Sequence, residues 1–200
     1  MRIFGIDPGS IRTGYGCVET DGRRHHLVAF GAIASPATDS FPDRLARIHL
    51  ELSQLLAAHR PDTVAIENVF HGKNARSALK LGHARGVAIL AAVQAGCHVV
   101  EYTPAEVKRA VVGHGRADKH QVQHMIKLLL GLAAAPKPHD AADALAIAIC
   151  HLHSAPWKGI GDLGSGIVGR QITHDPRSLI PGPQSKAPRS WRQYRPPAAG

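Results

Sequence analysis

The sequence contains few aromatic residues, few cysteines and no long apolar run. Its 200 residues include four Phe, three Tyr and two Trp. The three cysteines lie far apart and form no CxxC pair, which favours reduced thiols over a disulfide framework or a zinc site. No run of about 18 apolar residues is present, and Asp7 interrupts the stretch that a signal peptide would need. These absences predict a cytoplasmic protein with no membrane segment.

Acidic residues are also scarce relative to basic ones. Fifteen Asp and Glu face 24 Lys and Arg, which leaves a formal net charge of +9. Such a surplus favours a polyanionic partner, either nucleic acid or an anionic membrane surface, and charge alone does not distinguish the two. Seven of the basic and two of the acidic residues lie in residues 154–200, so that segment carries +5 and the rest +4.

Composition divides the chain into two parts. Residues 1–153 alternate between strand-like and helix-like patterns, whereas residues 154–200 are dense in Pro, Gly, Ser and Arg. The second segment has too little apolar surface to offset the loss of chain entropy on folding. We therefore expect one folded domain at 1–153 and a basic, disordered C-terminal tail at 154–200.

The order of elements predicts an α/β fold. Three strand-like segments open the chain, and Asp21-Gly22 between the second and third is a hairpin signal. Two further strands, TVAIEN and HVVEY, are each preceded by a segment with helical spacing, and three helices follow. This order predicts a mixed sheet, with three antiparallel strands followed by parallel strands, flanked by helices.

Four carboxylates stand where such a fold would bring them together. Asp7 and Glu67 each end an apolar strand, and Asp140 and Asp143 share one face of the first turns of the last predicted helix. An Asp at a helix start is also a common capping residue, which explains one of that pair but not Asp7 or Glu67.

Clustered carboxylates repel one another, and this repulsion points to bound cations. At about 4 Å and an effective dielectric of about 20, each like-charge pair costs about 4 kcal/mol. Oxygen-only ligation suits Mg²⁺ or Mn²⁺, and two such ions about 3.5–4 Å apart are the usual arrangement for phosphodiester hydrolysis. A basic protein with this set of residues is most simply a nuclease.

Four motifs, taken together, resemble one known family. GIDPGSIRTGYG, AIENVFHGKNARSALKLGHARGVAI, KRAVVGHGRADKHQVQHMI and HDAADALAIAICH are similar to the RuvC family of crossover (Holliday) junction endodeoxyribonucleases, in that family's order over residues 1–153. The resemblance implies a ribonuclease H-like fold and a homodimer that acts in DNA recombination and repair. It further implies paired symmetric nicks at four-way DNA junctions, leaving 5′-phosphate and 3′-hydroxyl ends. The branch-migration proteins RuvA and RuvB are the partners that it implies.

Position by position, the resemblance assigns catalytic and metal-binding roles to Asp7, Glu67, Asp140 and Asp143. It implies two Mg²⁺ ions per site, which Mn²⁺ would replace. Some relatives carry His at the first Asp of the final pair, so His139, directly before Asp140, is an alternative ligand.

The resemblance also assigns DNA contacts. Lys119, after the GHGRAD segment, and Lys108 would approach the scissile phosphate, and the ammonium of Lys119 would stabilise charge in the transition state. Phe70 would wedge or stack at the junction. The basic residues after Glu67 form a candidate phosphate-binding strip, for which a solvated helix face is the alternative: Lys73, Arg76, Lys80 and Arg85.

Three other functions compete with this assignment. One is another ribonuclease H-like nuclease acting on structured RNA, which the ENVFHGKN and GHGRADK segments disfavour. A second is a non-catalytic junction-binding protein, which four carboxylates disfavour because they would repel phosphate. A third is an actin-like ATPase, suggested by the first Gly-rich turn, but that fold needs a longer chain with a second phosphate loop.

Overall fold

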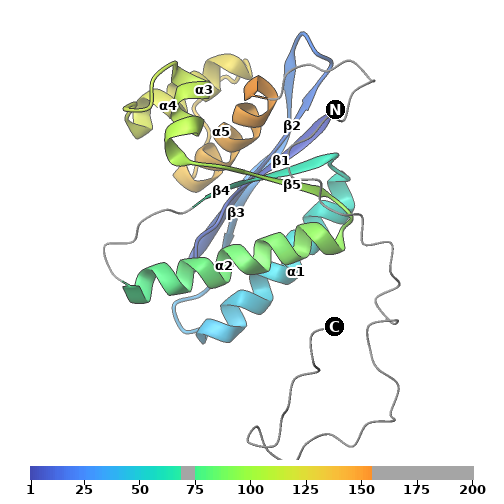
Figure 1. Ribbon diagram of the computed structural model, residues 1–200, viewed down its shortest axis with the longest axis vertical. Helices are drawn as coiled ribbons and strands as arrows, with labels where there is room; N and C mark the ends of the chain where they lie inside the picture. Colours follow the sequence, from blue (N-terminus) through green and yellow to red (C-terminus); the bar gives the residue numbers. More distant parts are fainter. Residues whose placement is uncertain (69–74, 155–200) are drawn as a thin grey trace, which may run out of the picture. The chain divides into compact units, whose positions relative to one another are not determined.

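A five-stranded sheet forms the centre of residues 1–68 and 75–154, the part of the chain that the computed structural model describes (Figure 1). The strand order is β3-β2-β1-β4-β5. Strand β1 pairs antiparallel with β2, and β2 with β3, whereas β1 pairs parallel with β4, and β4 with β5. The predicted mixed sheet is confirmed. The strands are β1 (Arg2–Asp7), β2 (Arg12–Thr20), β3 (His25–Ala34), β4 (Thr63–Glu67) and β5 (His98–Tyr102).

Helices cover both faces of the sheet (Figure 1). One face carries α1 and α2, which pack on each other, and the other carries α3, α4 and α5. Each face has its own cluster of buried apolar side chains. The helices are α1 (Phe41–His59), α2 (Ala75–Gln94), α3 (Pro104–Val112), α4 (Lys119–Leu129) and α5 (His139–Ser154).

Local capping signals set where the helices begin. Helix α3 starts with a capping box, in which Thr103 and Glu106 each accept from the other's backbone N–H. Asp118 and Gln121 form a second capping box at the start of α4. This second box places Lys119 at the first position of α4, at the end of the glycine-flanked segment.

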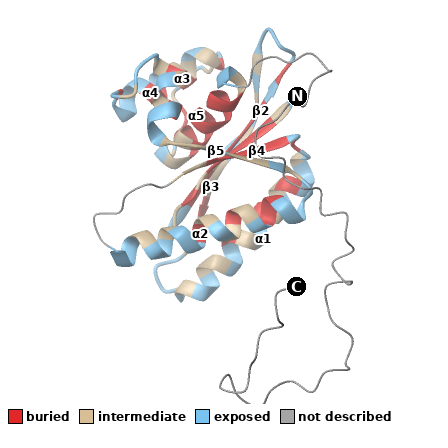
Figure 2. Cartoon of the chain, viewed as in Figure 1, coloured by how far each residue is buried: buried red, intermediate tan, exposed pale blue. Residues whose placement is uncertain are grey.

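Helix α5 lies directly on the sheet because glycines leave room for it. A Cβ atom added at Gly5 of β1 would collide with the carbonyl oxygen of Ala144, and one added at Gly14 of β2 would collide with that of Asp140. The helix is accordingly the most continuously buried element in the domain (Figure 2). The close approach brings the first turn of α5 against the ends of β1 and β2.

The predicted division of the chain into a domain and a tail stays a prediction. The last helix ends at Ser154, one residue past the predicted end of the folded domain at residue 153. The predicted C-terminal tail lies, apart from Ser154, outside the described residues. Among the helices that the structure describes, none is long and apolar enough to cross a membrane.

Candidate active site

Two of the predicted carboxylates come from neighbouring parallel strands. Ile6 of β1 pairs with Ile66 of β4, so Asp7 and Glu67, the next residue of each strand, end at the same edge of the sheet. Both residues are half-buried, because the strands that carry them are covered on both faces. Both side chains line one cleft in a partly dry environment, where repulsion between carboxylates is strong.

The other two carboxylates reach the same edge from α5. Gly14 pairs with Asp7 in the sheet, and the backbone of Asp140 lies against Gly14. Asp143 follows one helical turn later and lines a cleft together with Asp7 and Glu67. The structure thus brings all four predicted carboxylates to one end of the sheet.

The electrostatics of this end are those of a cluster of negative charge. Burial, and then repulsion by Glu67, Asp143 and Asp140, raises the pKa of Asp7 from 3.8 to about 8. The pKa of Glu67 is also raised, first by burial and then by Asp143. The positive charge of Lys119 opposes both increases.

Two cationic side chains contact the carboxylates of α5. Lys119 Nζ lies 3.5 Å from Asp143 Oδ2, and Arg12 Nη1 lies 3.7 Å from Asp140 Oδ2. Each aspartate is therefore paired with a cation from a different element, α4 for Asp143 and β2 for Asp140.

A cleft of about 290 Å³ opens over the cluster. Its charged lining comes from Asp7, Glu67, Asp143, Lys108 and Lys119, and its apolar lining from α3, α4 and α5. Of the four predicted carboxylates, all within the described residues, Asp140 is the one that does not line this cleft. Lys108 and Lys119, which the resemblance places near the scissile phosphate, line this cleft beside the carboxylates.

The donor set fits a hard divalent cation. Carboxylate oxygens are the ligands that Mg²⁺ and Mn²⁺ prefer, and Asp7, Glu67 and Asp143 line one cleft. Within residues 1–68 and 75–154, no three His, Cys, Asp or Glu side chains are placed so that they could hold a metal ion together. The pairing of Asp140 and Asp143 with cations is consistent with that result.

The other predicted DNA contacts are distributed differently. Phe70 and Lys73 lie outside the described residues. Lys80 lies over the ring of Phe41, with Nζ 5.6 Å from its centroid. Arg85 forms an ion pair with Glu101 of β5, so its guanidinium ties α2 to the sheet, which favours a packing role over phosphate contact.

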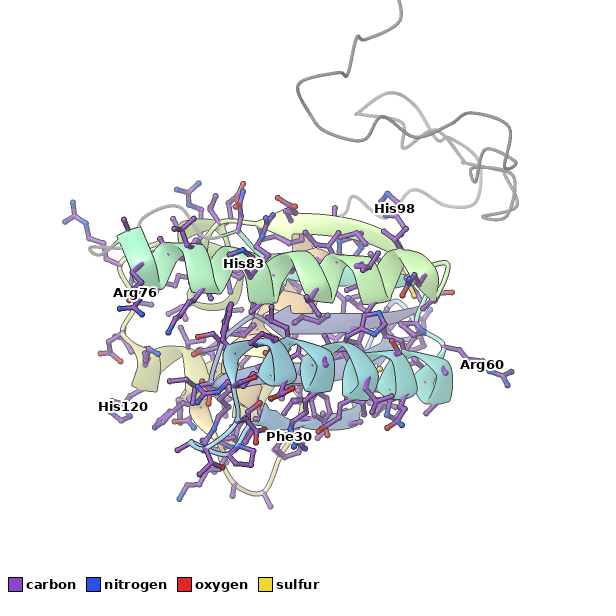
Figure 3. All side chains as sticks on the ribbon, turned by 90° about the horizontal axis from the view of Figure 1, so that it is seen from below. Phe30, Arg60, Arg76, His83, His98 and His120 are labelled. Atoms are coloured by element: carbon purple, nitrogen blue, oxygen red, sulfur yellow. The ribbon has the colours of Figure 1, made fainter. Side chains whose placement is uncertain are left out.

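Figure 3 shows where several basic side chains lie along the domain. Arg76 at the start of α2 and His120 at the start of α4 lie at one end, and Arg60 and His98 lie at the other. The first end is the carboxyl end of the parallel strands, where the cleft opens. The rings of His120 and His139 lie 6.3 Å apart, edge to face.

Sequence reasoning missed two features of this site. It did not identify Arg12, although the residue stands five positions after Asp7 in the first motif. It also did not use the glycines at positions 5, 14 and 16, which are the positions on β1 and β2 where α5 packs closely on the sheet. That glycine pattern was the available signal for the contact between β2 and α5.

The architecture and the site together define a class of protein. A sheet of three antiparallel and two parallel strands, with carboxylates at the ends of β1 and β4 and on the helix that crosses them, is a ribonuclease H-like fold with an acidic site. Comparison with known proteins narrows this class. The sequence profile described as "Crossover junction endodeoxyribonuclease RuvC" matches residues 3–151. The chain belongs to the RuvC family.

Individual relatives align with this chain over almost their whole length. Crossover junction endodeoxyribonuclease RuvC of Citrifermentans bemidjiense is 56% identical over 155 residues, which is 78% of this chain and 94% of that protein. The protein of the same name from Alkaliphilus oremlandii is 51% identical over 154 residues, 77% of this chain and 94% of that protein. The structure of Thermus thermophilus RuvC in complex with a Holliday junction substrate is 38% identical, with a TM-score of 0.73, and covers 76% of this chain and 93% of that one.

Proposed function

We propose that this protein is an endonuclease that resolves four-way DNA junctions by paired, symmetric nicks during recombination and repair. The observation that carries the proposal is the cleft in which Asp7, Glu67 and Asp143 face Lys108 and Lys119, in a chain that belongs to the RuvC family. The family relatives are named for this activity, and one relative has been solved with a Holliday junction.

Asp7, Glu67, Asp140 and Asp143 are the residues that would hold two Mg²⁺ ions, with Mn²⁺ as a substitute. When bound, such ions supply an activated water and stabilise the leaving 3′ oxygen, so that the products carry 5′-phosphate and 3′-hydroxyl ends. The cluster supports this role because Asp7, with a pKa of about 8, needs a nearby cation to be fully ionised at neutral pH. His139 stays an alternative to Asp140 as a ligand.

The lysines have a separate task in the proposal. Lys119 and Lys108 stand on the α3–α4 side of the cleft, opposite the strand carboxylates. An ammonium placed there stabilises the extra negative charge of a phosphoryl transition state. Further DNA contacts are assigned to Phe70, Lys73, Arg76 and Lys80, with the family resemblance as their support.

We infer a homodimer, because a two-fold junction needs two cuts and each chain offers one site. Helix α2 provides a candidate interface. Leu79, Leu90 and Val93 are about half or more exposed, and a Cβ at Gly82 or Gly86 would meet nothing within 4 Å. These positions recur at helical spacing, so they form one exposed apolar face with room for a second helix.

The remaining proposals rest on the family resemblance and on composition. RuvA and RuvB are proposed partners, which co-purification of the three proteins on a junction would test. Residues 1–153 are proposed as the nuclease domain and residues 154–200 as a basic tail. The cytoplasm is the proposed location.

The test of the proposed activity is a cleavage assay on three substrates. Purified protein with Mg²⁺ is offered a synthetic four-way junction, linear duplex DNA and structured RNA. We expect paired nicks in the junction alone, and cutting of RNA alone would favour the other ribonuclease H-like function.

Asp7→Asn separates the nuclease from a junction-binding protein. The variant loses the carboxylate but keeps the fold, so we expect junction binding to persist while cleavage disappears. Cleavage at the wild-type rate would show that the metal-site assignment is wrong.

A further inference from the structure

Arg12 is an exposed arginine held in a fixed place beside the acidic cluster. It is the first residue of β2 and pairs with Ala34 of β3, while Ser35 N donates to the carbonyl of Ile11 at 3.2 Å. Two residues further on, Gly14 packs against the backbone of Asp140. Both ends of the ion pair between Arg12 and Asp140 are therefore anchored by the sheet and by α5.

This pair separates Asp140 from the other three carboxylates. Asp7, Glu67 and Asp143 line the cleft, whereas Asp140 does not, and its Oδ2 lies 3.7 Å from Arg12 Nη1. Asp140 is nevertheless close enough for its charge to raise the pKa of Asp7. The aspartate is thus near the site but turned to a cation that the chain itself supplies.

The ion pair between Arg12 and Asp140 can exchange its partners. The side chain of Arg12 is 50% exposed and that of Asp140 is 35% exposed, and ion pairs at this level of exposure contribute little free energy. A divalent ion therefore competes well for the carboxylate. The released guanidinium, with its fork of N–H donors, is suited to a phosphate diester rather than to solvent.

We propose that Arg12 is a positioning residue that holds Asp140 away from the metal site in the free protein and transfers to a phosphate of bound DNA when Asp140 turns to the metal. Metal binding and DNA binding then favour each other, since each occupies one partner of the pair and frees the other. The inference rests on the proposed function, because it takes Asp140 as a metal ligand and DNA as the substrate.

The first test uses Mn²⁺ alone, without DNA, and measures its affinity by electron paramagnetic resonance. In Arg12→Ala the competing cation is gone, so we expect Mn²⁺ to bind about two- to five-fold more tightly than to the wild type. Arg12→Lys, which keeps the charge, should bind Mn²⁺ as the wild type does. An unchanged or weaker affinity in Arg12→Ala would overturn the proposal.

Two controls separate pairing with Asp140 from other effects. Arg23, exposed at the turn between β2 and β3, lies at the opposite end of β2, so Arg23→Ala changes net charge equally but should leave Mn²⁺ affinity unchanged. In an Asp140→Asn background, Arg12→Ala should no longer raise the affinity. A rise in either control of the size seen in Arg12→Ala alone would show a general field effect and overturn the role assigned to Arg12.

The second test measures junction binding at several salt concentrations, with EDTA or with Mn²⁺. Stopped-flow mixing allows binding to be followed before the junction is cleaved. In the presence of Mn²⁺, we expect Arg12→Ala to reduce the slope of log affinity against log salt by about one, which corresponds to one phosphate contact. In EDTA, we expect the substitution to have little effect on this slope. An equal effect in both conditions would mean a permanent phosphate contact and would overturn the exchange. Failure of the proposed function is distinguishable, because it would appear as uncut junctions while the DNA-free Mn²⁺ result stood.

Discussion

Lys119 is one of two lysines, with Lys108, that line the cleft beside the carboxylates. Its Nζ lies 3.5 Å from Asp143 Oδ2, and its charge lowers the pKa values of Asp7 and Glu67. Its position depends on the Asp118 capping box, which fixes the first turn of α4. Lys119 therefore acts both on the carboxylates and on whatever phosphate enters the cleft.

Replacing Lys119 should impair chemistry more than binding. We expect Lys119→Ala to lower the rate of junction cleavage by about 10²-fold, because a preorganised charge next to the reacting phosphate is lost. Single-turnover kinetics at saturating enzyme measure this loss separately from affinity. Lys127→Ala, on the same helix, is the matched control, and an equal loss in both variants would contradict the assignment.

The ionisation of Asp7 links the site to stability. Its pKa is about 8 in the folded protein against 3.8 for an ordinary Asp, so the folded state holds this proton more tightly than the unfolded chain. The contribution of Asp7 is therefore complete below about pH 4 and is lost as the pH rises towards 8. Mg²⁺, by neutralising the cluster, should reverse that loss.

Asp7→Asn should remove this pH dependence, because the amide has no proton to lose. At pH 8 in EDTA we expect the variant to be more stable than the wild type by about 2 kcal/mol, which raises Tm by about 4–8 °C for a chain of this size. Calorimetry at pH 5 and pH 8 provides the comparison. Parallel Tm profiles for the two proteins would contradict the raised pKa.

At the scale of elements, α5 and the first two strands form the frame of the site. The helix is seated on glycines of β1 and β2, and no side chain from those positions separates its backbone from the sheet. This contact determines how far the carboxylates of α5 lie from Asp7. A small change in helix position would therefore move two of the four carboxylates together.

Gly5→Ala tests this frame. The added methyl group would collide with the backbone of α5, so we expect a loss of about 3 kcal/mol in the free energy of unfolding and impaired cleavage in the folded fraction. Urea denaturation measures the loss. Gly115→Ala, where the new Cβ would meet its nearest neighbour, the Ala105 carbonyl oxygen, at an ordinary 3.5 Å, should be nearly neutral, and a Gly5→Ala variant of equal stability would disprove the close contact.

At the scale of the whole molecule, the positive charge is divided between two parts of the sequence. Of the net +9, the segment 154–200 carries +5, and the rest of the chain carries +4 although it includes the four carboxylates of the site. The basic charge near the cleft is placed against particular carboxylates, whereas that of the tail is spread along the sequence. We therefore expect general DNA affinity to come from the tail and selective chemistry from the domain.

Deletion of residues 155–200 should weaken binding to linear duplex DNA and reduce the slope of log affinity against log salt, by up to about four. Junction cleavage should persist, because no carboxylate of the site is removed. A filter-binding series from low to high salt gives the slope. Loss of junction cleavage on truncation would mean that the tail belongs to the active unit.

The proposed dimer gives a prediction at the same scale. Leu79→Asp places a charge on the exposed face of α2, so we expect the protein to become monomeric. The two nicks in one junction should then no longer be made together. Light scattering after size exclusion gives the mass. Leu128→Asp, at a similarly exposed position of α4, should remain dimeric, and a dimeric Leu79→Asp variant would exclude this face as the interface.

Patterns that depend on neighbours in the chain were readable from the amino-acid sequence. The strand-like and helix-like patterns and the strand-ending positions of Asp7 and Glu67 predicted the sheet, the helices and two lining residues of the cleft, because such patterns are local properties. The family motifs added Lys108 and Lys119, which the structure places in the same cleft.

Pairings between distant elements required the folded chain. No pattern along the sequence shows that Arg12 meets Asp140 or that Arg85 meets Glu101, because these contacts arise only when α5 seats on β2 and α2 on β5. The same packing raises the pKa of Asp7 by removing water from a cluster of like charges. Residue types and their spacing determine the chemistry available to this protein, and tertiary packing determines which charges oppose one another, since electrostatic energy depends on distance and burial rather than on order in the chain.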